Sequence, residues 1–383
     1  MPSAARAVDR RTVLWATVTP LASIFGSGFL ILVPVLERSI GSLAIVGVIG
    51  ACTIAWFLGS AIRHIVGTVE PLAAAGRLDP ATARLERISD VLIVIAYVIS
   101  VALYLRIMAQ YIVNFASPGS VDAERALASA AVVAITVVGV IRGFAGLDAL
   151  ERVALVAVLV LTTVLGGAFF FADAGDLLGQ GLQLPPLPDT GLGTALLMVG
   201  GVLIAVQGFE TVRYLGEEYD APTRIWASRV AQLVATSIYV GFVAVSTPLM
   251  GIGTPAGIDT DLLDITQRVV PVLAPVLVLC AVLSQFSAAT ADTAAVGGNL
   301  HSLASRAMRG SRAYALNGIA AVALIWAVPT LTIITVASRA FGAYYCAQCV
   351  IAMRTCDGTA RKLGYGALAV LMAAVTLLAL PAS

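Results

Sequence analysis

The sequence predicts an all-α polytopic membrane protein with about eleven transmembrane helices, arranged as a 5+5 inverted repeat with discontinuous helices 1 and 6. Three observations predict this fold class. Hydrophobic residues make up 59% of the 383 residues and charged residues only 12%, about half the share of a soluble domain. Eleven apolar runs are close to the length that crosses a bilayer. Two of these runs contain glycine and polar residues near their middles.

The eleven apolar runs follow one another with mostly short connections. Their limits are 12–36, 40–63, 88–115, 125–142, 149–173, 192–216, 225–250, 270–300, 313–328, 331–353 and 363–381. Only the region of Pro329 separates the ninth run from the tenth, and a proline interrupts a helix because it lacks the N–H donor.

Basic residues are distributed unevenly among the connections. One alternate set carries Arg6, Arg10, Arg11, Arg77, Arg84, Arg87, Arg142, Arg152, Arg224, Arg306, Arg309, Arg312, Arg354, Arg361 and Lys362. The opposite set carries only Arg38, Arg125 and Arg268. Because basic residues concentrate on the cytoplasmic side, we expect a multi-pass protein of the cell (inner) membrane with a cytoplasmic N-terminus. Eleven spans then place the C-terminus on the extracytoplasmic side.

The first ten spans divide into two blocks of nearly equal length. Because five is odd, the second block starts on the opposite side of the membrane, which is the pattern of an inverted repeat. The expected parts are a cytoplasmic N-terminus at 1–11, repeat one at 12–173, an extracytoplasmic loop at 174–191, repeat two at 192–353, and a cytoplasmic loop with span eleven at 354–383.

Each block begins with a span that carries a glycine near its centre. Gly26-Ser27-Gly28 lies in the first span and Gln207-Gly208-Phe209-Glu210 in the sixth. A break there frees backbone groups for a ligand, although glycines in the first span are equally explained by close helix packing. A carboxylate such as Glu210 in an apolar span is a functional candidate because burying its charge is costly.

These motifs resemble those of the amino acid–polyamine–organocation (APC) superfamily of transporters. Gly26-Ser27-Gly28-Phe29 is similar to the family's glycine motif. Gly208-Phe209-Glu210, with the later run Glu217-Glu218-Tyr219-Asp220-Ala221-Pro222, is similar to its span-six signature. The resemblance implies a LeuT-type fold and alternating access. Eleven spans instead of twelve, and the absence of lysine from span five, depart from the family's pattern.

The leading hypothesis is a secondary active transporter of a small organic solute, most plausibly an amino acid or related amine. The freed amides of the first span would hold a carboxylate, and groups around Val206 and Gln207 an amine. The candidate substrate-binding residues are Ser23, Gly26, Ser27, Gly28, Tyr97, Tyr104, Val206, Gln207 and Phe209. Tyr97 and Tyr104 belong to a stripe that lines a substrate path or packs in the core.

Coupling to H⁺ or Na⁺ is expected at Glu210, Thr290, Asp292 and Ala22. Hydroxyl and carboxylate oxygens in span eight are ligands that a small cation prefers. By resemblance to sodium-coupled members, Thr290 with the carbonyl of Ala22 forms a Na⁺ site, and Asp292 is a further ligand or a proton carrier. The alternatives are that Thr290 bonds to its own helix and that Arg213 pairs with Glu210.

Arg106 and Arg339 lie in the outer halves of their spans and are expected to line a vestibule or gate, or to pair with acids such as Glu37. Cys346 and Cys349 are more simply explained by packing than by a metal or redox site.

The other function classes are less consistent with the sequence. An enzyme would need a nucleophile–base or metal pair at membrane depth, and only isolated acids are visible, so we expect none. A non-transporting sensor or scaffold of the same fold is the alternative, but these 383 residues show no signalling domain. The expected partners are a small-molecule substrate and the lipid bilayer; the net charge of +1 gives no reason to expect nucleic acid, and no cofactor beyond a coupling Na⁺ is expected. The oligomeric state is not predicted.

Overall fold

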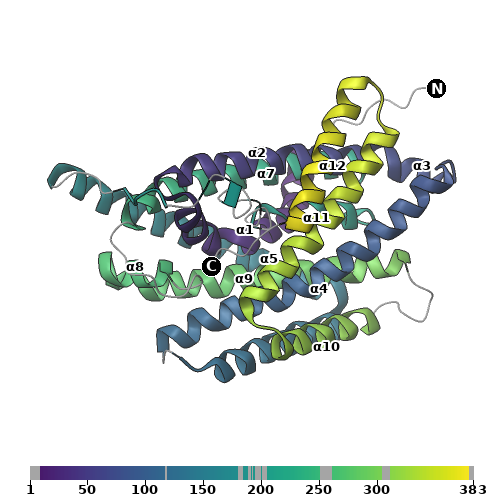
Figure 1. Ribbon diagram of the computed structural model, residues 1–383. Coiled ribbons are helices and arrows are strands. Elements are labelled where there is room, and N and C mark those ends of the chain that lie inside the picture. The colour runs from purple at the N-terminus through teal and green to yellow at the C-terminus, as the bar shows by residue number, and fades with distance from the viewer. Residues whose placement is uncertain are drawn as a thin grey trace.

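The computed structural model describes residues 9–116, 119–179, 184–188, 191, 193–194, 200, 205–250, 261–303 and 311–378. Within these ranges the regular structure is entirely helical. Figure 1 shows long helices packed into one elongated bundle, with the hairpin of α11 and α12 crossing the others.

The described residues of the first half form five α-helices. They are α1 (Arg10–Ile40), α2 (Ala44–His64), α3 (Glu70–Ala74), α4 (Pro80–Ala116) and α5 (Val121–Gly179). A π-helical turn, Ile65–Val69, joins α2 to α3. The long α5 contains Gly143 with φ 61° and ψ −152°, a conformation that glycine adopts readily and that divides the helix into two parts.

The described residues of the second half include the 3₁₀ helix η4 (Phe209–Leu215). Six α-helices follow: α7 (Ala221–Met250), α8 (Asp261–Val269), α9 (Ala274–Leu303), α10 (Ser311–Ala327), α11 (Thr330–Thr355) and α12 (Thr359–Leu378). Short 3₁₀ turns at Gly41–Leu43 and Pro271–Leu273 precede α2 and α9.

The predicted spans agree with these helices. The two parts of α5 correspond to spans four and five, and Pro329 separates α10 from α11 as expected. The connection predicted from residue 174 onward is partly wrong, because α5 continues to Gly179. Most of the first half of span six, residues 192–204, lies outside the described residues.

Several helices begin at side chains that accept bonds from their free N–H groups. Asp79 accepts from the backbone N–H groups of Ala81 and Thr82, each at 3.1 Å, at the start of α4. Asp220 accepts from the N–H of Thr223 at 3.1 Å at the start of α7. A capping carboxylate stabilises a helix start by satisfying donors that lack a partner within the helix. The Asp-Ala-Pro run in the span-six signature is therefore a helix start.

The bundle is apolar outside, and polar and charged side chains are buried within its largely apolar core. Ile319, Val370 and Val153 are 70–74% exposed, whereas Glu210, Gln285 and Asp292 are 0% exposed. Six described helical stretches are long and apolar enough to cross a membrane: Leu30–Ala74, Pro80–Ala116, Val121–Asp173, Ala221–Met250, Pro271–Asn299 and Thr359–Leu378. An apolar exterior around buried polar groups is expected when lipid is the solvent. The chain is a multi-pass membrane protein.

Candidate functional site

The sixth membrane segment is interrupted at Gly208, as the sequence predicts. Gln207 and Gly208 lie outside any helix, and Gly208 has φ 120°. A Cβ atom at Gly208 would lie 2.5 Å from the backbone nitrogen of Ile24 and 2.7 Å from the carbonyl carbon of Ser23, both on α1. Glycine alone combines this backbone conformation with so close an approach. The break therefore presses the polar residues around Gly208 against the middle of α1.

The first span is not interrupted, and the prediction of a break at Gly26 to Gly28 is wrong. The backbone is α-helical throughout α1. A Cβ atom at Gly26 would overlap Ala288 of α9, and one at Gly28 would overlap Ala205. Both glycines therefore serve close packing, which was the alternative explanation. Because the backbone at these positions is helical, the predicted cradle of freed amides does not form.

Two carbonyls of α1 nevertheless receive side-chain donors. The Tyr239 hydroxyl donates to the carbonyl oxygen of Ile24 at 2.5 Å, and Nε2 of Gln285 donates to that of Gly26 at 2.7 Å. Donors inserted beside a helix compete with its own hydrogen bonds. The middle of α1 is thus held by polar groups from α7 and α9, at the level of the break in the sixth segment.

Glu210 lies immediately after the break and is 0% exposed. Its carboxylate accepts from the Tyr345 hydroxyl at 2.6 Å, from the Gly208 N–H at 2.9 Å and from the Tyr97 hydroxyl at 3.3 Å. Arg213 is not its partner, because that side chain turns toward acids on α3 and α4. Glu210 is therefore held by hydroxyl and backbone donors rather than by a positive charge.

Asp292 of α9 forms a second buried acidic centre. Its carboxylate accepts from the hydroxyl of Ser23 on α1 at 3.0 Å and from the hydroxyl of Ser100 on α4. Within the described residues neither Asp292 nor Glu210 forms an ion pair, and the two are near enough for their charges to interact. Two uncompensated carboxylates inside a membrane bundle are costly and are expected where cations bind or move.

The remaining substrate candidates surround the break. Nε2 of Gln207 donates to the Tyr104 hydroxyl at 2.6 Å, and the ring of Phe209 stacks on Tyr345 with centroids 5.3 Å apart. Val206 lines a void of about 10 Å³ together with Tyr239. That void is too small for an organic solute. The side chain of Ser27 lies outside the described residues.

The predicted Na⁺ site is not assembled as the resemblance implied. The Thr290 hydroxyl donates to the carbonyl oxygen of Phe286 in its own helix at 2.8 Å, and Ala22 lies within the uninterrupted α1. The oxygen ligands that do meet Asp292 come from Ser23 and Ser100. Carboxylate and hydroxyl oxygens are chemically suited to Na⁺ and to a proton.

The two gate candidates differ in their surroundings. Arg106 is 3% exposed and donates to the carbonyl oxygen of Ile325 at 3.0 Å and to the Thr330 hydroxyl at 2.9 Å. Its nearest acid is Glu124 at 3.9 Å. Arg106 therefore ties α4 to the junction of α10 and α11. Arg339 is exposed on α11.

Two buried residues of this region were not predicted from the sequence. Tyr345 was overlooked because it lies in a helix of ordinary apolar composition. Glu151 is 1% exposed on α5, and its backbone carbonyl accepts from the Ser287 hydroxyl of α9 at 3.4 Å. Glu151 lies at the start of the fifth apolar run, next to Asp148 and Arg152. A charged residue at the end of a span is common, so nothing in the sequence indicated that it is buried.

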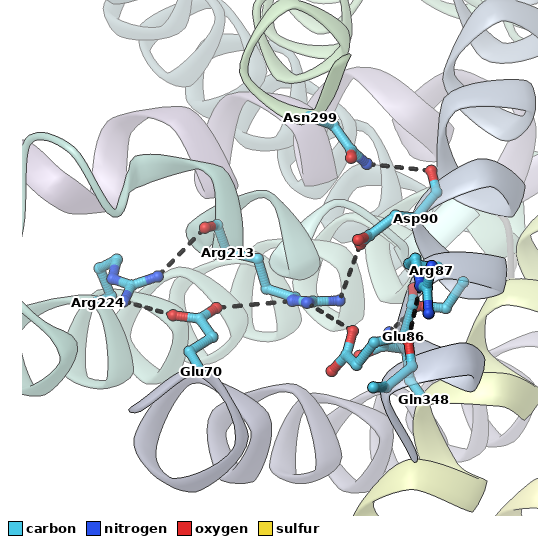
Figure 2. A network of polar contacts seen from close by, with 10 residues as sticks. Glu70, Glu86, Arg87, Asp90, Arg213, Arg224, Asn299 and Gln348 are labelled. Carbon is cyan, nitrogen blue, oxygen red and sulfur yellow. Dashed lines mark hydrogen bonds and ion pairs between the residues drawn. The ribbon is translucent and has the colours of Figure 1, made fainter. Parts of the chain in front are cut away.

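Ion pairs hold η4 against α3, α4 and α7 (Figure 2). Arg213 pairs with Glu86 at 3.0 Å, Glu70 at 3.7 Å and Asp90 at 3.8 Å. Arg224 pairs with the other oxygen of Glu70 at 2.7 Å and donates to the carbonyl oxygens of residues 212 and 213 at 3.3 and 3.2 Å. This network fixes the segment that follows the break to helices on both of its sides.

A hollow of about 440 Å³ lies beside this network, with Asp90 in its wall. Its walls include Arg213, Tyr214, Glu217 and Tyr314. The Tyr214 ring contacts the Tyr97 ring edge to face, with centroids 6.0 Å apart, and Tyr97 donates to Glu210. Tyr214 and Tyr97 thus connect the wall of this hollow to Glu210.

The comparisons with known proteins agree with this geometry. Residues 6–379 match the family model described as APC superfamily transporter. An uncharacterized protein of Aquifex aeolicus (strain VF5) is 31% identical over 355 residues, which cover 90% of this chain and 84% of that protein.

Two solved structures share the fold at low identity. Mhp1, a nucleobase-cation-symport-1 family transporter in a closed conformation with bromovinylhydantoin bound, has a TM-score of 0.56 and 13% identity over 96% of this chain and 91% of its own. A manganese transporter of Eremococcus coleocola, solved as a point mutant, has a TM-score of 0.56 and 9% identity over 98% and 87%. The LeuT-type fold is shown, and these similar proteins are transporters rather than enzymes. The chain belongs to the APC superfamily of transporters.

Proposed function

We propose that the chain is a secondary active transporter of an amino acid or related amine, working by alternating access and coupled to a cation gradient. It would lie in the cell membrane with its N-terminus in the cytoplasm, because the arginine-rich connections lie on that side.

The observation that carries the proposal is the pair of buried carboxylates at the break. Glu210 and Asp292 are 0% exposed and are held by Tyr, Ser and backbone donors alone within the described residues. A buried carboxylate without a positive partner favours the binding of a cation from outside the protein. Two such groups provide one position for a coupling ion and one for a solute that carries a positive charge.

We assign the coupling ion to Asp292. Its partners are the serine hydroxyls of Ser23 and Ser100, and a hydroxyl can donate to a carboxylate or turn to offer a lone pair to a metal ion. The three oxygen-bearing side chains come from α1, α4 and α9. Binding of H⁺ or Na⁺ there would stabilise the contact among three helices that must move relative to one another during alternating access.

We assign the solute amine to the side of Glu210. The carboxylate lies beside the stacked rings of Phe209 and Tyr345, and aromatic faces attract cations. Gln207 and Tyr104 supply further polar groups. Since α1 offers no cradle for an anion, the amine rather than a carboxylate is the group that anchors the solute.

The test is an uptake screen in proteoliposomes with Na⁺ and pH gradients imposed separately. We expect at least one radiolabelled amine or amino acid to accumulate under one gradient and not without it. Solutes that carry no amine should not compete with it. Accumulation of anionic solutes alone, or no flux of any solute that binds the purified protein, would contradict the proposal and favour a non-transporting sensor.

A further inference from the structure

A second large hollow lies apart from the central site and is lined by residues of α2, α7 and α12. It has a volume of about 1090 Å³, and no residue that lines it also lines the 440 Å³ hollow or the central void. One part of its wall is apolar and opens on the outer face of the bundle, where Phe57 and Leu233 are 53% and 56% exposed. The other part carries Arg63, Arg229 and Arg361.

Arg63 is the deepest of these cations. It is 7% exposed, and within the described residues its guanidinium donates only to neutral oxygens: Oε1 of Gln232 at 2.5 Å, the carbonyl of Trp56 at 3.1 Å and the hydroxyl of Ser228 at 3.4 Å. It also lies 4.7 Å from the centre of the Trp56 ring. A buried arginine with no carboxylate partner retains an uncompensated charge that an anion would stabilise.

The side chains that line the hollow carry a net positive charge, as Arg63 does. None of the described residues that line it is acidic, whereas three are arginines and one is His64. Asp357, which is not part of the lining, interacts electrostatically with His64. Arg229 lies 5.1 Å from the ring of Trp226, so its side chain is also held in place at the wall.

We propose that this hollow binds the anionic phosphate headgroup of a membrane phospholipid, with an acyl chain along the apolar wall. Arginine forms paired hydrogen bonds to phosphate, and basic pockets between membrane helices bind anionic headgroups. Leu371 of α12 and Leu233 of α7 belong to the apolar wall along which the acyl chain would lie. A soluble phosphate would use the arginines but leave the apolar wall empty, so the lipid accounts for both parts of the hollow.

A lipid in this hollow would lie where α2 already contacts α11 and α12 through hydrogen bonds. His64 of α2 hydrogen-bonds to Thr355 at the end of α11 at 3.0 Å, and the Tyr365 hydroxyl of α12 donates to the carbonyl oxygen of Ser60 at 3.4 Å. The headgroup would add a bridge between α2, α7 and α12, beside these polar contacts. Bound lipid should therefore raise the thermal stability of the protein.

The experiment titrates the purified, delipidated full-length protein with phosphatidylglycerol and follows thermal unfolding, with native mass spectrometry to count bound lipids. Phosphatidylcholine with the same acyl chains and sn-glycerol 3-phosphate are the comparison ligands. We expect one tightly retained phosphatidylglycerol and a stabilisation that neither comparison ligand produces. Equal stabilisation by phosphatidylcholine, or stabilisation by sn-glycerol 3-phosphate, would overturn the proposal.

The double variant Arg229→Gln/Arg361→Gln tests the site without altering the buried Arg63. We expect the affinity for phosphatidylglycerol to fall about fivefold for each arginine removed, since each basic residue near a membrane surface contributes about 1 kcal/mol. The control is Arg77→Gln/Arg84→Gln, which makes the same change of charge at positions outside the hollow. Equal affinities of the two double variants would overturn the proposal.

Discussion

Glu210 and Asp292 are both buried carboxylates, yet the groups that hold them differ in kind. Glu210 accepts a backbone N–H and two tyrosine hydroxyls, donors whose positions are fixed by η4 and by large packed rings. Asp292 accepts from two serine hydroxyls, which can rotate. Glu210 is thus suited to binding the solute amine at a fixed position. Asp292 is suited to binding and releasing a small cation.

The two tyrosines that contact Glu210 provide a matched pair of substitutions. Tyr345→Phe removes a hydrogen bond of 2.6 Å and Tyr97→Phe one of 3.3 Å. We expect Tyr345→Phe to cost about 1.5–3 kcal/mol of stability, the usual contribution of a hydrogen bond to a charged group, and Tyr97→Phe to cost less. Thermal or denaturant unfolding in detergent measures the difference. A larger effect of Tyr97→Phe would contradict the assigned geometry.

Gly208→Ala tests the backbone conformation at the break. At φ 120°, with the Ile24 nitrogen 2.5 Å from the added carbon, alanine is expected to lower stability by about 1–3 kcal/mol or more and to abolish uptake. Gly241→Ala on α7 is the control, because nothing lies within 4 Å of the carbon that it adds. Unfolding midpoints of the two variants give the comparison, and indistinguishable midpoints would show that the sixth segment is not broken at this position.

At the scale of the helices, the sequence predicts positions better than it predicts conformation. Pro329 and the apolar runs place the spans because covalent geometry and burial in lipid act locally. Gly28 and Gly208 look alike in sequence, yet one packs a continuous helix against Ala205 and the other breaks the chain beside Ile24. Whether a glycine packs a continuous helix or breaks it depends on the neighbouring helices. Their positions cannot be deduced from a single sequence.

The ion-pair network around η4 is an element-scale feature that the sequence did not predict. Arg213 lies one turn beyond Glu210, so local spacing allowed a pair between them, which was the alternative explanation. The helix break rotates Arg213 toward Glu86 and Glu70 instead. Partners more than a hundred residues away in sequence decide the outcome, and their approach is a property of the assembled bundle.

Glu86→Gln should weaken the attachment of η4 to α4. Because it removes the shortest ion pair of the partly buried Arg213, we expect a loss of about 1–3 kcal/mol, below the full cost of a wholly buried pair. A cysteine introduced at Gly298, in the wall of the 440 Å³ hollow, should also react faster with a water-soluble maleimide. The control Asp122→Asn removes an exposed pair with Arg125 and should change neither measurement. Unchanged labelling in Glu86→Gln would show that the ion-pair network does not restrict access of the reagent to this hollow.

At the scale of the whole molecule, arginine distribution and span count predict which side of the membrane each end faces. The outer surface and most of the core are both apolar. This explains why composition alone identifies a membrane protein. The acidic centre was predictable in part, since Glu210 and Asp292 are charges within apolar runs. Their hydroxyl partners were not, because serine and tyrosine are common in such helices and only packing selects those that meet.

Reporter fusions test the predicted orientation. Alkaline phosphatase fused after residue 383 should be active, and the same enzyme fused after Asp220 should be inactive, because basic connections remain in the cytoplasm. A reporter that is fluorescent only in the cytoplasm, placed at the same two positions, should give the opposite pattern. The same activity at both positions would refute the odd number of spans.

The central claim is that a cation bound at Asp292 couples its gradient to the movement of solute. Asp292→Asn keeps the size of the side chain and can still meet Ser23 and Ser100, so the variant should fold. In proteoliposomes with an imposed Na⁺ or pH gradient, we predict that wild-type protein accumulates the solute and that Asp292→Asn does not, although the variant still exchanges solute down its own gradient. Accumulation by Asp292→Asn equal to that of the wild type would contradict the claim.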